Sequence, residues 1–322
     1  MTRRALRAAA AVLAVALAVV PVASDERLTL VFAPPGEGAA LLGASDTFTR
    51  AMTLLDRQIR ARSPRIVTEA EVLAFLSAQA TAWRAAETRR LQPIADDVAA
   101  RVRAVAPMLT GRVPLVRTTA LVESGLPHTR GTAIVLPERV LAWNDAALRR
   151  LLAHELFHIL TRGRPALRDR LYAAIGFRPC VTVDVPETMA ATKITNPDAP
   201  DERFAISIRF QGVPFEVIPM VFSSAASAAA AVTTPIAAQA ALRFVAVERA
   251  GDRCVLAVGP DVAVMFPETD VEGLFDQVGR NTRYVMHPEE ILADNFALLV
   301  LGERNVPSPE IVERVRTILT AP

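Results

Sequence analysis

Two of the chain's four histidines lie four residues apart in the apolar segment LLAHELFHIL, residues 151–160. Residues four apart on a helix share one face, so His154 and His158 can both reach one metal ion. Zinc takes imidazole nitrogens at about 2.0–2.1 Å, and a catalytic site has three protein ligands and a water. Glu155 lies one position round the helix, where it can take a proton from that water. The pattern HExxH therefore predicts one Zn²⁺ with a glutamate general base.

The same pattern has a purely structural interpretation, in which the two histidines pack in a core without a metal. A buried helix is indicated by the apolar neighbours of the motif, which are Leu151, Leu152, Leu156, Phe157, Ile159 and Leu160. Two imidazoles and a carboxylate buried there without partners would cost considerable free energy. We therefore favour a metal-binding helix.

A catalytic zinc site needs a third protein ligand. The metzincin pattern puts a histidine six residues after His158, but this chain has Arg164 there. The later segment YVMHPEEILADNF offers a carboxylate instead, because Glu290 and Asp294 lie one above the other if it is helical. Acids at a helix start can also simply complement the helix dipole. Beside HELFH, we favour a ligand.

HELFH followed by a helix with the pattern ExxxD resembles the gluzincins, a group of zinc metallopeptidases, and suggests an exported bacterial-type member. The resemblance implies an α+β fold with a zincin-like catalytic core and a peptide or protein substrate. It implies that Glu290 is the third metal ligand. It also implies that Asp294 accepts a hydrogen bond from the far nitrogen of a ligating histidine.

The resemblance suggests further roles near the site. Gluzincins lay an extended substrate along an edge strand, which we expect to be GTAIVLP, residues 131–137. In several members a tyrosine shortly before the glutamate stabilises the oxyanion, and we assign this catalytic role to Tyr284; its alternative is a half-buried structural tyrosine. His287 is a second candidate, or caps the helix. His128 is expected at the surface, in a turn.

One departure from the compact gluzincins is the gap of 132 residues between His158 and Glu290. Residues 180–267 in this gap are rich in short β-type segments and predict an inserted subdomain. The gap also contains acids that compete with Glu290 as ligands, although they lack its helical context: Asp184, Glu187 and Glu202.

The N-terminal residues 1–24 are typical of a signal peptide, with Arg3, Arg4 and Arg7 followed by about thirteen apolar residues. The alternative is an uncleaved membrane anchor, for which the apolar run is short. Removal of this segment reduces the 36 basic residues to 33 against 34 acidic ones. We expect an exported protein, periplasmic or secreted, with no nucleic-acid partner and no stable membrane insertion.

The two cysteines, Cys180 and Cys254, suggest one disulfide in an exported chain. Such a bond could stabilise the fold by roughly 4 kcal/mol in the chain-entropy model. The alternative is two buried free thiols.

Patterning divides the rest of the chain into a helical layer with the first part of the core (25–179), the β-rich insertion (180–267) and a helical C-terminal part (268–322). Thr68 and Glu71 form a capping-box pattern that opens a helix over residues 69–90, and Pro93 should break this helical run. Residues 114–122 and 131–137 predict strands.

Two other functions remain open at this point. A zincin-like envelope protein without catalytic activity could bind a partner through residues 180–267. A zinc hydrolase could also act on a non-peptide amide or ester, because the same activated water attacks any carbonyl.

Overall fold

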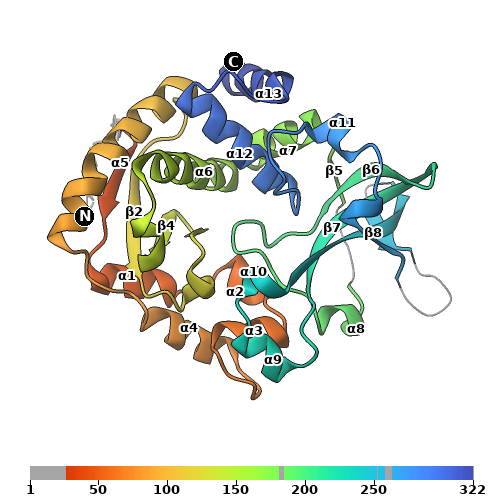
Figure 1. Ribbon diagram of the computed structural model, residues 1–322, viewed down its shortest axis with the longest axis horizontal. Helices are drawn as coiled ribbons and strands as arrows, with labels where there is room; N and C mark the ends of the chain where they lie inside the picture. Colours follow the sequence, from red (N-terminus) through yellow and green to blue (C-terminus); the bar gives the residue numbers. More distant parts are fainter. Residues whose placement is uncertain (1–26, 181–184, 252, 258–262, 322) are drawn as a thin grey trace, which may run out of the picture.

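The computed structural model describes residues 27–180, 185–251, 253–257 and 263–321 (Figure 1). Helices and two separate sheets make up these residues, which confirms the mixed α+β class. The predicted signal peptide, residues 1–24, lies outside the described residues.

The first sheet has the strand order β1-β2-β4-β3. β1 (Thr29–Phe32), β2 (Arg112–Thr118) and β4 (Ala133–Pro137) run parallel, and β3 (His128–Arg130) pairs antiparallel with β4 at the edge. The prediction that GTAIVLP forms the edge strand is therefore wrong, because β4 is paired with β2 on one side and with β3 on the other. The edge strand is β3, in a segment where the sequence suggested a turn.

Helices cover both faces of the first sheet, as expected for parallel strands buried on both sides. Ile134 and Leu136 face one cluster, and Ala133 and Val135 face the other. The first cluster contains α5 (Ala85–Val105), α6 (Asp145–Gly163) and α12 (Pro288–Leu301). The second contains α1 (Pro35–Leu42), α2 (Thr47–Ala51) and α4 (Glu69–Ser77).

The second sheet is antiparallel, and its strands except β5 lie within residues 180–267, the segment predicted to be β-rich. Its order is β10-β8-β7-β6-β5, with β9 also paired to β8. One face joins the same core as α6 and α12 through Phe204, Ile206 and Phe244. The strands are β5 (Arg178–Pro179), β6 (Phe204–Phe210), β7 (Val213–Ser223), β8 (Ala240–Ala250), β9 (Arg253–Leu256) and β10 (Met265–Pro267).

The other face of the second sheet holds the predicted disulfide. Cys180 and Cys254 are bonded, 74 positions apart in sequence, and both are buried. The remaining helices surround the two sheets: α3 (Leu54–Arg60), α7 (Pro165–Ala174), α8 (Glu187–Ala190), α9 (Ala228–Thr233), α10 (Ile236–Gln239), α11 (Leu274–Val278) and α13 (Pro309–Thr320).

The two helices that carry the motifs have well-defined starts. Asn144 caps α6 by accepting a hydrogen bond from the Ala147 amide at 2.9 Å. Pro288 is the first residue of α12, and the His287 ring accepts from the Glu289 amide at 3.1 Å. The two helices pack directly against each other (Figure 1).

Two predictions about the helical layer differ from the structure. The capping box of Thr68 and Glu71 is present, but its helix ends at Ser77 and α5 starts separately. Pro93 lies inside α5 and does not break it. Pro93 is on the exposed face of α5, where water can solvate the carbonyl that loses its amide partner.

Among the residues that the structure describes, no helix combines the length and the apolar character needed to cross a membrane.

Loss of the disulfide should destabilise the fold without altering its architecture. We expect Cys254→Ser to lower the free energy of unfolding by about 2–4 kcal/mol, because the unfolded chain regains the freedom of a long closed loop. Urea denaturation followed by circular dichroism measures this change. Cys180→Ser should have the same effect, and the double variant should be no worse. Additive losses would contradict a single shared bond.

Candidate metal centre

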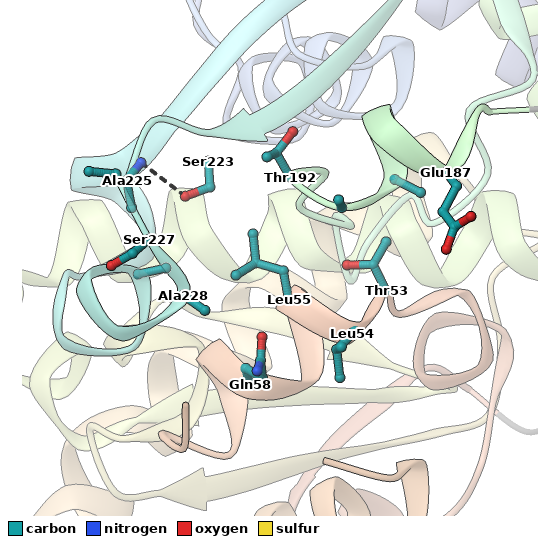
Figure 2. Close-up of a pocket in the computed structure, with 14 residues that line it drawn as sticks. Thr53, Leu54, Leu55, Gln58, Glu187, Thr192, Ser223, Ala225, Ser227 and Ala228 are labelled. Atoms are coloured by element: carbon teal, nitrogen blue, oxygen red, sulfur yellow. Dashed lines mark hydrogen bonds between the residues drawn. The ribbon is translucent and has the colours of Figure 1, made fainter. Parts of the chain in front are cut away.

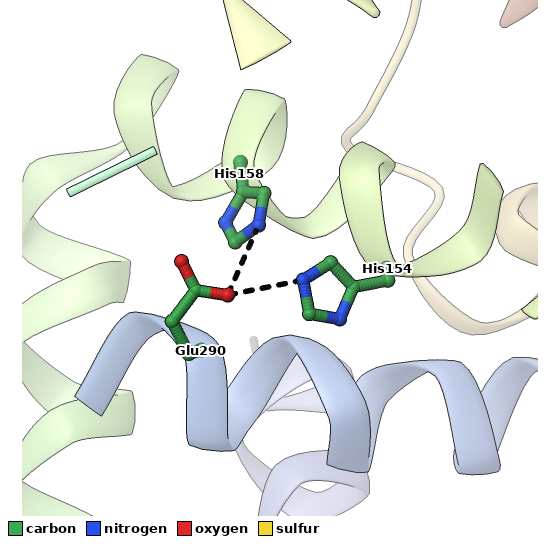
Figure 3. A group of neighbouring side chains, drawn as sticks. All are labelled: His154, His158 and Glu290. Carbon is green, nitrogen blue, oxygen red and sulfur yellow. Dashed lines mark hydrogen bonds and ion pairs between the residues drawn. The ribbon is translucent and has the colours of Figure 1, made fainter. Parts of the chain in front are cut away.

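His154, His158 and Glu290 lie together where α6 crosses α12 (Figure 3). Nε2 of His154 is 3.1 Å from Oε2 of Glu290, and Nε2 of His158 is 3.8 Å from the same oxygen. The two rings are arranged edge to face, with centroids 4.8 Å apart. Residues 132 positions apart in sequence are thus brought together as the two motifs predicted.

The donor set fits a divalent metal ion. Donors bound to a tetrahedral zinc at 2.0–2.1 Å stand about 3.4 Å apart, close to the separations seen here. His158 is only 1% exposed, and no group in the described part of the chain forms a hydrogen bond with its Nε2. An unpartnered buried nitrogen is costly, and a metal bound at the shared oxygen of Glu290 would satisfy it. Two imidazoles and one carboxylate also suit several first-row transition metals, so the geometry alone leaves the choice of metal open.

Carboxylates on α12 orient both imidazoles from behind. Nδ1 of His154 donates to Asp294 at 3.2 Å, and Nδ1 of His158 donates to Glu289 at 2.9 Å. Thr282 donates to the second oxygen of Asp294 at 2.5 Å. With Nδ1 donating, each ring can present the lone pair of Nε2 to the metal position.

Glu289 is the centre of a buried network. Besides His158, its carboxylate accepts hydrogen bonds from Thr161, at 2.5 Å, and from the hydroxyl of Tyr172. Burial alone would raise the pKa of Glu289, but these donors outweigh burial and lower it. The carboxylate that orients His158 is therefore charged at neutral pH.

A second group of close ligand atoms is formed by Glu155, His158 and Asp198. The amide and the hydroxyl of Thr129 both lie 2.6 Å from Oδ1 of Asp198, and the hydroxyl lies 3.4 Å from Glu155. The group shares His158 with the first one, and it places Asp198 next to the predicted general base. Asp198 comes from the segment Ile194–Pro200 between α8 and β6.

The segment Ile194–Pro200 is held from below by α3. Asp56 accepts hydrogen bonds from the amide and the hydroxyl of Thr195. Arg60 donates a hydrogen bond to the carbonyl of Thr195 at 2.7 Å. Further along, Asn196 donates to Oε1 of Glu290 at 2.7 Å. This leaves Oε2 of Glu290 to face the two histidines.

The electrostatics of the centre are those of closely spaced carboxylates and imidazoles. Burial would lower the pKa of His158, but the charges of Asp198 and Glu290 raise it to about 9. Burial likewise opposes protonation of His154, but hydrogen bonds with Asp294 and Glu290 raise its pKa well above the ordinary value. Burial, then the charge of Asp198, raises the pKa of Glu155 to about 8. In the metal-free protein these groups hold protons that a metal would displace.

Tyr284 lies beside the centre and is 43% exposed. It lines a cavity of about 410 Å³ together with Asn196 and Asp198. Partial burial, then the charges of Glu290 and Asp198, raise the pKa of its hydroxyl well above the ordinary value, so it remains a hydrogen-bond donor.

The other two histidines have structural surroundings. His287 caps α12, which was one of the two roles expected for it, the other being an oxyanion donor. The expected surface position of His128 is wrong, because its side chain is buried in β3 at 1% exposure. Its Nδ1 lies 3.3 Å from the Leu126 carbonyl, so the ring is accommodated by a local backbone contact.

The two rival acids that the structure describes, Glu202 and Glu187, do not join the centre. Glu202 pairs with Lys193 at 2.9 Å. Glu187 lines a separate cavity of about 490 Å³ between α3, α8 and α9 (Figure 2). Glu187 is the one ionisable side chain lining that cavity in the described part of the chain. Asp184 lies outside the described residues.

Sequence reasoning missed Glu289, Asn196 and Asp198. Glu289 was next to Glu290 in the motif, and a helix places adjacent residues about 100° apart, so it could have been assigned to a second histidine. Asn196 and Asp198 belong to a loop that no periodic pattern connects to α6. Only the fold brings them to the centre.

No protein-family model matches the chain, and comparisons with curated proteins and with solved structures returned no match. The support for a metal centre is therefore the geometry of the residues themselves.

Metal binding should release protons. Because the pKa of His158 is raised to about 9 and that of His154 is also raised, both imidazoles are protonated in the metal-free protein at pH 7. We expect about one to two protons released per Zn²⁺ at pH 7, and an apparent affinity that falls as the pH drops from 9 to 6. Calorimetric titration in two buffers with different ionisation enthalpies counts these protons. Buffer-independent enthalpies would show that the imidazoles are already neutral.

Proposed function

We propose that the protein is a zinc-dependent metallopeptidase of gluzincin type, which hydrolyses peptide bonds with a metal-activated water. The observation that carries this proposal is the convergence of His154, His158 and Glu290 on one point, with Glu155 beside it. Three protein ligands leave a zinc ion one position for water or substrate. A bound zinc would supply Lewis-acid activation of that water and of the substrate carbonyl.

Glu155 is the proposed general base. It accepts a proton as the water attacks the carbonyl carbon, and it returns the proton to the departing amine nitrogen. Burial raises the pKa of Glu155 to about 8 in the metal-free protein. The positive charge of a bound zinc would lower this pKa and favour the carboxylate form that a general base requires. The Thr129 hydroxyl, which is also bonded to Asp198, lies 3.4 Å from the Glu155 carboxylate on the side of the edge strand.

Tyr284 is the proposed oxyanion donor. Its hydroxyl stays protonated, and Tyr284 lines the same cavity as Asp198. Such a donor stabilises the negative charge that develops on the substrate oxygen in the transition state. Asp294 and Glu289 have a different role, because they fix the orientation of the two imidazoles before substrate binds.

We also propose that the protein is exported, to the periplasm or the medium. This rests on the signal-peptide pattern of residues 1–24 and on the disulfide between Cys180 and Cys254, a bond typical of oxidising compartments.

The metal and the general base can be tested separately. Wild-type protein purified without chelators should contain about one zinc per chain, and His154→Ala and Glu290→Ala should lose it. Glu155→Gln should keep the zinc and lose hydrolysis of a peptide library by about 100-fold or more. Elemental analysis and mass spectrometry of the library measure the two properties. A metal-free wild type, or full activity in Glu155→Gln, would contradict the proposal.

Loss of the tyrosine hydroxyl should affect turnover alone. We expect Tyr284→Phe to lower kcat by about 100-fold with little change in KM, because the donor acts in the transition state. Tyr172→Phe, at the other tyrosine of the chain, is the comparison: its hydroxyl bonds Glu289, which orients His158, so its loss should weaken zinc binding more than it lowers the kcat of zinc-loaded protein. Unchanged kcat in Tyr284→Phe, with zinc content intact, would leave the tyrosine as a structural residue.

A further inference from the structure

The carboxylate of Asp198 is fixed at one oxygen and open at the other. Its Oδ1 accepts the amide and hydroxyl of Thr129, both at 2.6 Å. No donor in the described ranges bonds Oδ2, and the side chain borders the cavity of about 410 Å³ beside Tyr284. A second, accessible oxygen held this firmly is suited to bind a cation or a hydrogen-bond donor.

Asp198 is not one of the three ligands of the proposed zinc, although it belongs to a second group of side chains that could hold a metal. Its ligand atoms group with those of Glu155 and His158, and not with the set that contains His154 and Glu290. Asp198 therefore lies next to Glu155 and also lines the cavity that Tyr284 borders.

The segment that carries Asp198 closes the outer edge of the first sheet. Thr129 is the central residue of β3, and its amide, which would pair with an extended substrate, is bonded to Asp198. Arg162 donates to the Gly131 carbonyl at 2.7 Å and to the Asp198 carbonyl at 3.3 Å. A substrate chain cannot continue along β3 past this point unless the segment moves.

Movement of this segment is opposed by the network beneath it. Arg60 is 2% exposed and its guanidinium bonds Asp56, Glu123 and the Thr195 carbonyl, each at 2.7–2.8 Å. Asp56 in turn bonds Thr195. The closed edge is therefore a built feature of the fold, and the cleft ends at Asp198.

Charge indicates which end of a substrate chain fits this closed cleft. Arg60 is the one cationic side chain lining the cavity in the described part of the chain, and two carboxylates already neutralise it. Asp198 and Glu123 leave the lining with excess negative charge. A substrate carboxylate would be repelled, whereas an ammonium group would find an open acceptor.

We propose that the site acts on peptides with a free amino terminus, with Asp198 binding the α-ammonium group. This rests on the proposed peptidase function. Hydrolysis then breaks the first C–N bond, joins the water oxygen to the carbonyl carbon, and sends a water proton through Glu155 to the new amine. The apolar residues of the cavity receive the side chain of the first substrate residue; they include Leu126, Ile194, Val221, Ile236 and Met286.

The test compares trileucine amide with its N-acetylated form. Calorimetry on zinc-loaded Glu155→Gln, which does not turn over, should show that acetylation weakens binding by at least about 10-fold, since it removes a charged hydrogen bond. Asp198→Asn in the same background should reduce this ratio to about one. Asp276→Asn, at an exposed position on α11, is the matched control and should keep the full ratio.

Hydrolysis by wild-type protein separates failure of this inference from failure of the proposed function. Preferential release of the first residue from the free peptide supports the inference. Equal binding and internal cleavage of the acetylated peptide would overturn it while leaving a peptidase. Two zinc ions per chain that fall to one in Asp198→Asn would also overturn it, because a metal would then occupy that carboxylate. Absence of both zinc and hydrolysis would remove the proposed function itself.

Discussion

The packing of α6 against α12 buries two imidazoles among carboxylates, and the rest of the site depends on satisfying those groups. Both Nδ1 atoms are satisfied by acids on α12, Asp294 and Glu289. The two Nε2 atoms and one oxygen of Glu290 converge on a single point. A divalent cation is the partner that satisfies all three together, because polar groups buried without partners are costly. The same interface therefore links stability, metal binding and the proposed chemistry.

The two sheets contribute different residues and contacts around the interface between α6 and α12. The first sheet supplies the backing of α6 and ends in the edge strand β3, which brings Thr129 to Asp198. The second sheet packs on the same core. It also holds the segment that carries Asp198 by backbone hydrogen bonds, for example from the Ile194 amide to the Val221 carbonyl. The long gap between the motifs thus contributes a wall of the centre, and it is part of the site's construction.

The sequence predicted the features that depend on local periodicity. His154 and His158 share a helical face, and Glu290 and Asp294 lie one turn apart on another helix, so their meeting could be inferred from helix geometry. It could not predict Asp198 or Asn196, because loop residues carry no periodic signal and reach the centre through tertiary contacts. It placed the edge strand at β4 because β3 has only three residues, within a turn-like stretch. Pro93 was misjudged because exposure, which permits it inside α5, is a property of packing.

The central claim is that one metal ion is held by side chains of α6 and α12. An anomalous-difference map from crystals of the zinc-loaded protein, collected on both sides of the zinc edge, tests it most directly. The account predicts a single peak about 2.0–2.2 Å from Nε2 of His154, Nε2 of His158 and a carboxylate oxygen of Glu290. A peak bound by Glu155, His158 and Asp198 instead, or no ordered peak at this interface, would contradict it.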